Sequence, residues 1–298
     1  MSDTLPIGHW VDQALHDLLD HDAAAFDTVG RAIEGLAALI ERSLQAVPMW
    51  MMMAFFIGIG LWRVGWRFGL FTAASLFLIS ATGFWDQTIV TLGLTLSSTI
   101  ISLALGVPLG IWAARSRVVS AVVRPILDLM QTMPAFVYLI PAAMLFGLGR
   151  VPGILSTVIF AMPPAVRLTS LGIRQVNMEL VEAGLAFGCT PRQLLYKVQI
   201  PNALPSIMQG VNQTIMMALS MVIIASMVGA GGLGNEVLAS IQRLDIGLGF
   251  ESGLSVVLLA IILDRITESF GRAPGTQKAA MFSGLRHLFN AKAAPVQT

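Results

Sequence analysis

The sequence predicts an all-α, polytopic membrane protein, and three observations support this class. Hydrophobic residues make up 55% of the 298-residue chain and charged residues only 12%, whereas soluble domains carry about 25% charged residues. Several apolar runs approach the ~20 residues that an α-helix needs to cross the hydrocarbon core. The length suits one helical bundle rather than several domains. We therefore expect a membrane helical bundle with about seven transmembrane helices.

The first 46 residues form an acidic segment with eight Asp or Glu side chains against two Arg. Leucine, isoleucine, valine and phenylalanine recur in this segment near helical spacing, which favours one or two amphipathic helices at the membrane surface. A partly disordered tail is the alternative. No cleavable signal peptide is expected, because this segment lacks an apolar core near its start.

Seven apolar runs follow, and each is expected to cross the membrane. Two extra N-terminal helices are predicted in the region 47–85, and five core helices in the region 86–271. The seven predicted spans are 47–62, 68–85, 88–114, 134–148, 152–173, 207–228 and 254–266. Some of them are short or contain proline, which is tolerated where a helix packs on protein or lines a cavity. Residues 272–298 are left as a C-terminal tail.

The distribution of lysine and arginine predicts the orientation, because cytoplasmic loops carry an excess of both residues. With the C-terminus in the cytoplasm, 14 of the 18 basic residues fall on the inner side and four on the outer side. The opposite orientation reverses this ratio. We therefore expect a protein of the inner (plasma) membrane whose acidic N-terminal tail lies outside and whose C-terminal tail is cytoplasmic.

A polar stretch at 179–205 separates two of the predicted spans on the cytoplasmic side. Gly188 can adopt the positive φ that ends a first short helix. Thr190 is suited to the N-cap of a second helix, and Gln193 completes a capping box with it. The second helix is then expected to stop at two prolines, Pro201 and Pro205. Two well-capped helices between membrane spans predict a docking site for another subunit.

The letters of this stretch match a known signature. EAGLAFG at 182–188, nine further residues and VQIP at 198–201 resemble the "EAA" motif of ABC-importer permeases, E-A-A-x3-G-x9-I-x-L-P. Glycine replaces the second alanine, and Val and Ile replace Ile and Leu. The resemblance implies a type I importer permease fold with a five-helix core. It also implies coupling helices that dock on a nucleotide-binding subunit through Glu182, Ala183, Gly184, Gly188 and Pro201. Small side chains at 183, 184 and 186 are expected to leave a flat docking surface.

The resemblance extends over most of 88–271. Four segments are similar to the permease of glycine betaine/proline betaine importers, the ProW type. They are PILDLMQTMPAFVYLIPAAMLFGLGRVPG (125–153), IFAMPPAVRLTSLGIRQV (159–176), NQTIMMALSMVIIASMVGAGGLG (212–234) and RLDIGLGFESGL with AIILDRITESFG (243–271). The substrates that this implies are quaternary ammonium solutes: glycine betaine, proline betaine, choline or carnitine. Such importers use two ATPases and a separate binding protein, so one docking loop per chain implies a homodimer.

The chain itself is not expected to be an enzyme. It contains no GxxxxGK[ST] phosphate loop, so ATP and Mg²⁺ are expected on the partner subunit and no cofactor on this chain. The four histidines lie in the two tails without metal-ligand spacing, so no metal site is expected. The expected partners are two ATPase subunits, an extracytoplasmic binding protein, a second copy of the chain and membrane lipid, with no nucleic acid.

Polar and aromatic residues inside two apolar runs are candidates for the solute path. In a bilayer such groups turn toward other helices or toward a water-filled route, and an aromatic face attracts a quaternary ammonium. Interhelical hydrogen bonding and packing are the alternative for each residue. The candidate path residues are Met133, Phe136, Tyr138, Asn212, Gln213 and Ser220.

Glycines cluster at 229–234, where the sixth predicted span ends on the outer side. The sequence GAGGLG gives a flexible backbone that can approach another surface closely. No lysine follows it, so nucleotide binding is not expected. We expect Gly231, Gly232 and Gly234 to contact the binding protein.

An ion-driven secondary transporter is the competing functional class. Asp86, Asp128 and Asp264 in or near apolar runs would be its candidate proton carriers. Asp128 follows Arg124 at helical ion-pair spacing, however, and Asp264 precedes Arg265 near the inner end of its span. Ion pairs at the membrane surface are therefore favoured over a proton relay. The inverted repeats of many secondary transporters are not visible in the sequence.

Overall fold

The computed structural model describes residues 7–271, and every regular element in that range is helical. In chain order the elements are α1 (Ile7–Gln45), α2 (Met49–Arg63), α3 (Trp66–Ala81), α4 (Trp85–Arg115), α5 (Arg117–Thr132), α6 (Phe136–Phe146), α7 (Arg150–Arg174), α8 (Met178–Ala186), α9 (Pro191–Gln193), the π-helical turn η1 (Leu194–Gln199), α10 (Ile200–Ala225), the 3₁₀ turn η2 (Ser226–Val228), α11 (Leu233–Arg243) and α12 (Ile246–Gly271). The all-α class is thus confirmed. The predicted tail 272–298 lies outside the described residues.

The number of candidate spans within residues 7–271 is smaller than predicted. Four helices are long and apolar enough to cross a membrane: α4, α7, α12 and the continuous helix over Pro191–Val228. The count rises to six if two bent pairs, the second part of α1 with α2 and α5 with α6, each form one span. The predicted span at 134–148 is too short to cross a membrane by itself, because α6 has 11 residues and is only about 17 Å long.

Three helices form the centre of the bundle. Glycines allow α4 to approach α7 closely: a Cβ on Gly110 would lie 2.7 Å from the Val166 carbonyl oxygen. Gly210 brings α10 close to α7 as well, with the Pro164 carbonyl oxygen 3.3 Å from the position of a Cβ. Gly106 of α4 also faces α7, since a Cβ there would lie 3.0 Å from Ala165 Cβ. Small residues at helix interfaces are typical of membrane bundles.

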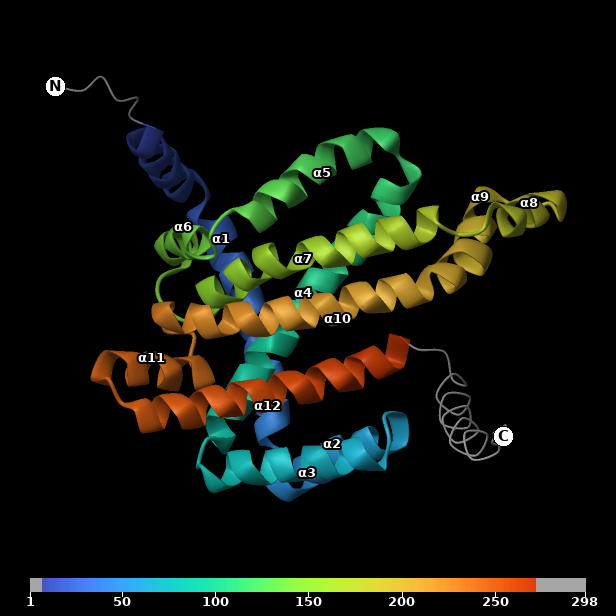
Figure 1. Cartoon of the computed structure of the whole chain (residues 1–298). Helices are drawn as coiled ribbons and strands as arrows, with labels where there is room; N and C mark the ends of the chain where they lie inside the picture. The colour runs from blue at the N-terminus through green and yellow to red at the C-terminus, as the bar shows by residue number, and fades with distance from the viewer. Residues whose placement is uncertain (1–6, 272–298) are drawn as a thin grey trace, which may run out of the picture.

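The two short helices α2 and α3 form a hairpin beside α12 (Figure 1). Leu76 and Ile79 of α3 pack with Ile262 and Ile266 of α12 in one apolar cluster. At the turn between α2 and α3, Arg63 donates a hydrogen bond to the Ser269 carbonyl oxygen, 3.1 Å away. The hairpin therefore adds to the edge of the bundle and holds the last turn of α12.

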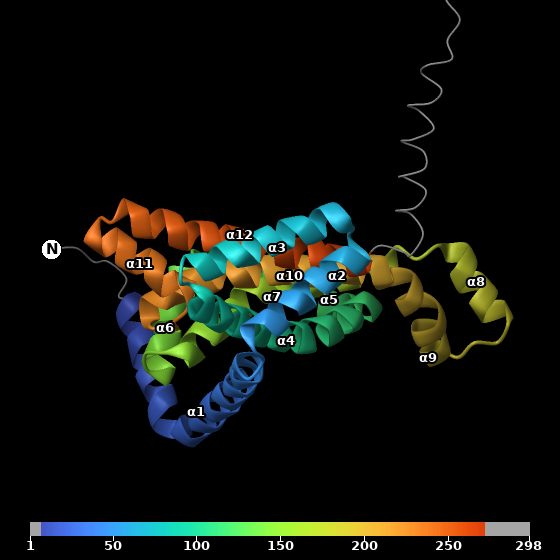
Figure 2. The ribbon, with the colours of Figure 1, turned by 90° about the horizontal axis from the view of Figure 1, so that it is seen from below.

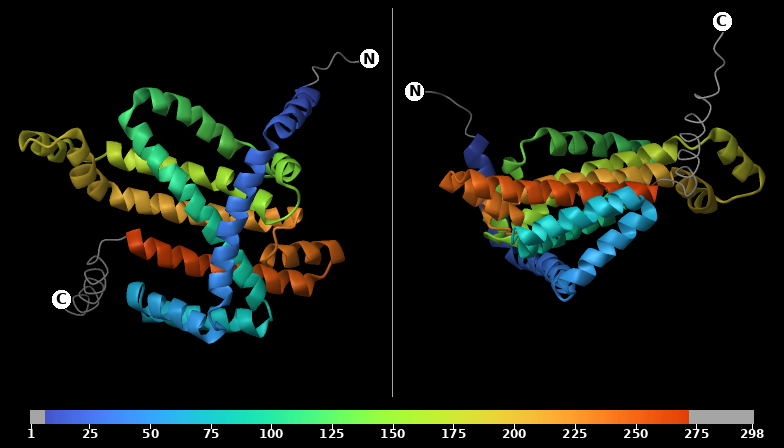
Figure 3. Two further views of the ribbon diagram at one scale, coloured as in Figure 1. Left: turned by 180° about the vertical axis from the view of Figure 1, so that it is seen from behind. Right: turned by 60° about the horizontal axis from the view of Figure 1, so that its bottom comes forward.

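Helix α1 is a single amphipathic helix that crosses the other helices steeply (Figure 3). Its second part meets α2 at 95°. Phe26 packs edge-to-face on Phe146 of α6, and the buried Glu41 forms a 2.7 Å ion pair with Arg150 at the start of α7. The prediction of a helix over this segment is thus confirmed for the described residues, and Phe26 and Glu41 attach it to the bundle. A position at the membrane surface stays a prediction.

Two helices were not foreseen from the sequence. Helix α5 begins at the N-cap Ser116, whose hydroxyl accepts a hydrogen bond from the Val119 amide, and it turns by 98° into α6. Its Asp128 pairs with Arg167 of α7 at 2.5 Å rather than with Arg124, as its sequence spacing suggested. Helix α11 is the second, and it packs beside α12 on the far side of the glycine turn (Figure 2).

The bundle has two distinct ends. The α2–α3 turn, the α4–α5 turn, the end of α12 and the helices α8 and α9 lie at one end, whereas α6 and α11 lie at the other (Figure 1). Most of the described basic residues that were assigned to the cytoplasm fall at the first end, which we call the basic end. The opposite end is called the outer end.

Candidate functional site

The polar stretch at 179–205 forms a helical arm that extends beyond the basic end of the bundle (Figures 1 and 2). We define this helical arm as α8, α9 and η1, residues 178–199. Helix α8 leads outward and η1 returns into α10. Asn177 caps α8, since its side-chain oxygen accepts a 3.0 Å hydrogen bond from the Glu179 amide. The tip of the arm therefore has its own local structure outside the helix bundle, whereas Val181 and Leu195 at its base pack with Ile173 at the end of α7.

The bend at the tip of the helical arm follows the local sequence signals. Gly188 has φ +76°. The Cys189 amide donates to the Gly184 carbonyl and the Gly188 amide to the Leu185 carbonyl, which is the Schellman arrangement. Thr190 and Gln193 then exchange the two hydrogen bonds of a capping box. The predictions of a glycine stop and a capping box are both confirmed.

The predicted helix stop at Pro201 and Pro205 is wrong. The helix continues through both prolines as α10, so that residues 191–228 form one 38-residue helix. Pro201 sits in the first turn of α10, where a missing N–H matters least. Immediately before it, η1 makes wider π-type turns, and the Ile200 amide donates to the Leu195 carbonyl. The wider turns take up the change in hydrogen-bond pattern that proline imposes.

Gly184 has a different role from the one expected. It is buried between α8 and η1, and a Cβ at this position would lie 2.8 Å from Leu194 Cδ1. The glycine in place of the second alanine therefore lets α8 fold back on η1. It does not form part of a flat outer surface, as its small side chain suggested. Glu182, Ala183, Gly188 and Pro201 are exposed.

The outer surface of the helical arm combines apolar and charged side chains. Phe187 at its tip is 89% exposed, and Met178 and Leu185 of α8 are also exposed. The exposed charged residues of the arm are Glu179, Glu182, Arg192 and Lys197. An exposed apolar group rimmed by charges is typical of a protein interaction site. Sequence reasoning missed Phe187 because it sits inside the motif at a position that the signature leaves open.

The structure divides the six candidate path residues into three groups. Two of them serve local structure: the Tyr138 hydroxyl donates to the Met130 carbonyl 2.8 Å away, so it fastens α6 to the end of α5, and Asn212 is bonded to α12. Met133 lies half-buried at the bend between α5 and α6. Phe136, Gln213 and Ser220 are exposed.

The exposed candidates lie along one continuous face. Gln213 and Ser220 are seven residues apart on α10, and a further seven residues lead to the exposed Met227, so all three share one side of the helix. Met227 and Phe136 line an apolar cleft between α6 and the end of α10. We call the face formed by Gln213, Ser220, Met227 and Phe136 the α10 face.

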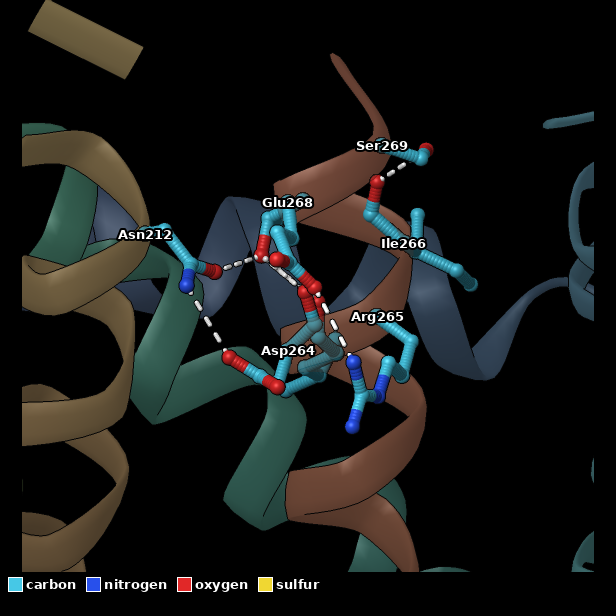
Figure 4. A network of polar contacts seen from close by, with 8 residues as sticks. Asn212, Asp264, Arg265, Ile266, Glu268 and Ser269 are labelled. Atoms are coloured by element: carbon cyan, nitrogen blue, oxygen red, sulfur yellow. Dashed lines mark hydrogen bonds and ion pairs between the residues drawn. The ribbon is translucent and has the colours of Figure 1, made fainter. Parts of the chain in front are cut away.

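Asn212 belongs to a polar cluster between α10 and α12 (Figure 4). Its Nδ2 donates a 2.9 Å hydrogen bond to Asp264 Oδ1, and its Oδ1 accepts a hydrogen bond from the Thr267 hydroxyl. Arg265 points away from this contact and pairs with Glu268 at 3.2 Å. The alternative of interhelical hydrogen bonding therefore describes Asn212 better than a place on the solute path. We call Asn212, Asp264 and Thr267 the α10–α12 cluster.

The glycine turn at 229–234 is packed into the outer end of the bundle. Gly229, Gly231 and Gly232 have positive φ, and a Cβ on Gly232 would lie 2.5 Å from Thr91 Oγ1. That hydroxyl also accepts a 2.8 Å hydrogen bond from the Leu233 amide. Gly232 and Gly234 are buried, so packing alone accounts for both. Contact with a binding protein remains a prediction, and only Gly229 and Gly231 keep exposed surface for it.

Comparisons with known proteins agree with this arrangement. Residues 106–273 match the family model described as "binding-protein-dependent transport system inner membrane component". The fold resembles that of a solved chain of the MetNI methionine ABC transporter, with a TM-score of 0.55 over 61% of this chain and 92% of that one, at 22% identity. At that identity the likeness concerns the fold alone.

Relatives of similar length are much closer in sequence. The glycine betaine/carnitine transport permease protein of Listeria monocytogenes is 47% identical over 90% of this chain and 96% of its own length. The glycine betaine/proline betaine permease of Escherichia coli is 47% identical over 90% and 76%, and the glycine betaine permease of Bacillus subtilis is 45% identical over 89% and 94%. The chain therefore belongs to the family of inner membrane components of binding-protein-dependent transport systems.

Proposed function

We propose that this chain is the transmembrane permease subunit of an ATP-driven importer for quaternary ammonium compatible solutes. Glycine betaine, proline betaine, choline and carnitine are the candidate substrates. Support comes from the relatives, whose names specify glycine betaine, carnitine and proline betaine, and from a more distant one named for choline, 30% identical over 58% of the chain. The chain moves the solute and catalyses no covalent step.

One observation carries the proposal: the helical arm extends beyond the bundle and exposes Phe187 at its tip. An exposed phenylalanine in water loses the stabilisation of about 1.5–3 kcal/mol that burial would give. The capping box and the Schellman bend fix the arm's shape before any partner binds, which reduces the entropic cost of docking. A preformed apolar surface that is surrounded by charged side chains suits a groove on an ATPase subunit.

The helical arm continues directly into α10, and this continuity gives a physical route for coupling. When ATP brings two nucleotide-binding subunits together, each docked arm moves with its subunit. Because Pro191–Val228 is one helix, the displacement reaches the outer end of the bundle. The path then opens outward to a loaded binding protein, and hydrolysis returns it inward. Glu182, Ala183, Gly188 and Pro201 form the exposed docking set, and Gly184 supports it from within.

The α10 face supports a functional assembly of two copies. Its exposed residues run from the middle of α10 to the outer end without a cover in the described part of the chain. A second copy facing it would enclose a route lined by Gln213, Ser220, Met227 and Phe136. Phe136 would attract a quaternary ammonium through its ring face. One helical arm per chain then matches two ATPase subunits.

The proposed orientation places the basic end in the cytoplasm. Lysine and arginine in cytoplasmic loops favour it, and an arm that docks on an ATPase needs it. The outer end, with α1, α6, α11 and the glycine turn, then faces the binding protein. Cysteine accessibility tests this in a Cys189→Ser background, because the native Cys189 is a free thiol in the arm. A cysteine at Arg192 should react with a membrane-impermeant maleimide only in inverted vesicles, and a cysteine at Arg243 only in right-side-out cells.

Reconstitution tests the function. The permease, candidate ATPase subunits and a binding protein are placed in liposomes with ATP inside the compartment that holds the ATPase. We expect uptake of labelled glycine betaine that needs all three components. Vesicles without ATPase but with a proton or sodium gradient are the matched control. Uptake in that control alone would overturn the proposal in favour of an ion-driven transporter.

A further inference from the structure

We infer that the α10–α12 cluster makes α12 move together with α10 when the helical arm is displaced. Asn212, Asp264 and Thr267 are thereby positioning residues for coupling, rather than part of the solute path. The inference rests on the proposed function, because it concerns how motion of a docked arm reaches the rest of the bundle.

The position of the cluster supports this role. Asn212 lies 12 residues into α10, about 18 Å from its start, and Asp264 lies seven residues before the end of α12. The contact therefore joins the half of α10 that is near the basic end to the half of α12 that is near the same end. Farther toward the outer end the two helices meet through apolar side chains, including Leu219, Leu259 and Leu263. Such contacts resist separation but permit sliding, whereas hydrogen bonds fix register.

The hydrogen bonds of the cluster are mutually dependent. The Asn212 side chain uses both ends of its amide, since the nitrogen donates to Asp264 and the oxygen accepts from Thr267. Reversing the amide would set its oxygen against the carboxylate of Asp264. Only one orientation therefore sets a donor against the Asp264 side-chain oxygen. A shift of α12 along α10 would break both bonds together.

The surroundings give the pair a cost of separation. Asn212, Asp264 and Thr267 are each partly buried, and a polar cleft of about 450 Å³ opens beside Asn212 and Asp264 at the foot of α10, next to Pro205. Removing one partner would leave a carboxylate or amide that water in this cleft reaches, so the cost is that of the lost hydrogen bond and not that of a buried, unsatisfied group. Helix α12 also carries the α2–α3 hairpin, so this edge of the bundle would follow α10 as one unit.

A reciprocal exchange tests the inference, because asparagine and aspartate have nearly the same shape. Asn212→Asp sets two carboxylates against each other, whereas Asn212→Asp with Asp264→Asn restores one donor facing one acceptor. The complete transporter is reconstituted, and solute uptake per ATP hydrolysed is measured. We expect this ratio to fall about tenfold in Asn212→Asp, with ATP hydrolysis within about twofold of wild type, and to return to within about twofold of wild type in the double variant. Arg124→Gln, an exposed side chain on α5, is the control and should leave the ratio unchanged.

Two results would overturn the inference: a double variant no better than Asn212→Asp, or an unchanged ratio in Asn212→Asp. The proposed function would fail separately, if the wild-type complex took up none of the four solutes. In that case the thermal unfolding of the purified permease still tests the contact. Asn212→Asp should lower the Tm and the double variant restore it, and an equal Tm in all three proteins would contradict the cluster itself.

Discussion

Glycine bends lie at the two ends of the long helix 191–228, and they use glycine for different reasons. Gly188 at the tip of the helical arm has φ +76° and no atom within 4 Å of where a Cβ would stand. Gly232 in the outer turn has φ +78°, and a Cβ there would lie 2.5 Å from Thr91 Oγ1. The first bend is free of neighbours and the second is enclosed. The comparison teaches that the outer turn needs glycine because the bundle encloses it, whereas the tip of the arm needs glycine only for its backbone conformation.

The largest expected effect comes from Gly232→Ala. Overpacking typically costs about 1–3 kcal/mol. The backbone of Gly232, with φ +78° and ψ −163°, lies in a region that is essentially confined to glycine and adds about 1–3 kcal/mol for a residue with a Cβ. We expect a loss of about 3 kcal/mol in the free energy of unfolding, seen as a lower Tm of the purified permease. Gly188→Ala is the matched control and should cost no more than about 1–2 kcal/mol. Equal losses at both positions would break the comparison.

Phe187→Ala should give the next largest effect, and on binding rather than on folding. A central aromatic anchor contributes about 2 kcal/mol or more to an interface, so we expect affinity for the ATPase subunit to fall about 30-fold. The dissociation constant of the detergent-solubilised pair measures this. Phe250→Ala removes a similarly exposed phenylalanine at the outer end and should leave the affinity unchanged. A wild-type affinity in Phe187→Ala would show that the tip does not dock.

Gly188→Val tests whether the bend itself is needed. A β-branched residue at positive φ is strained by about 1–2 kcal/mol, so the turn between α8 and α9 should open. We expect lower uptake per ATP hydrolysed with little change in Tm, because the helical arm lies outside the bundle. Gly188→Asn should retain coupling, since asparagine tolerates the left-handed region. Preserved uptake and coupling in Gly188→Val would show that Gly188 is incidental.

Glu182→Arg should have the smallest effect of the four. Its side chain is exposed, and reversal of a charge at the rim of an interface mainly changes the association rate. We expect the protein to insert normally and to bind the ATPase subunit about fivefold more weakly at low salt, with a smaller difference at high salt. Glu251→Arg, on the outer part of α12, is the control. Co-purification of the ATPase equal to wild type at every salt concentration would count against docking through Glu182.

The sequence predicts local features of the arm well, because they depend on neighbours along the chain. Each hydrogen bond of Gly188, Thr190 and Gln193 joins residues no more than five positions apart. The spacing of these residues is therefore enough to predict the bend. The helix stop predicted at Pro201 is wrong because of a local feature that the sequence does not show. Proline breaks the interior of a helix, but here a π-type turn precedes Pro201, so that Pro201 lies in the first turn of α10. Nothing in the letters LLYKVQ signals that turn.

Contacts between distant segments could not be inferred in the same way. Gly184 appears as a small surface residue until α8 folds back and brings Leu194 over it. Asn212 and Asp264 are 52 residues apart, and Asp264 seemed to belong with its neighbour Arg265. The apolar runs at 88–114, 152–173, 207–228 and 254–266 correctly located α4, α7, α10 and α12. The run at 134–148 did not reveal the 98° bend, since hydropathy records composition and not direction.

The π-helical turn η1 also sets the angular phase between the arm and α10. Successive residues of an α-helix are rotated by about 100° around its axis, and a π-type turn accommodates roughly one additional residue in the same rise. The direction in which Phe187 points therefore depends on how many residues lie within Leu194–Gln199, and not on which side chains the arm or its partner carries. A single insertion or deletion there would re-aim an otherwise unchanged arm around the helix axis. Evolution of this family could thus match a permease to a differently oriented ATPase groove by changing length before changing any contact residue.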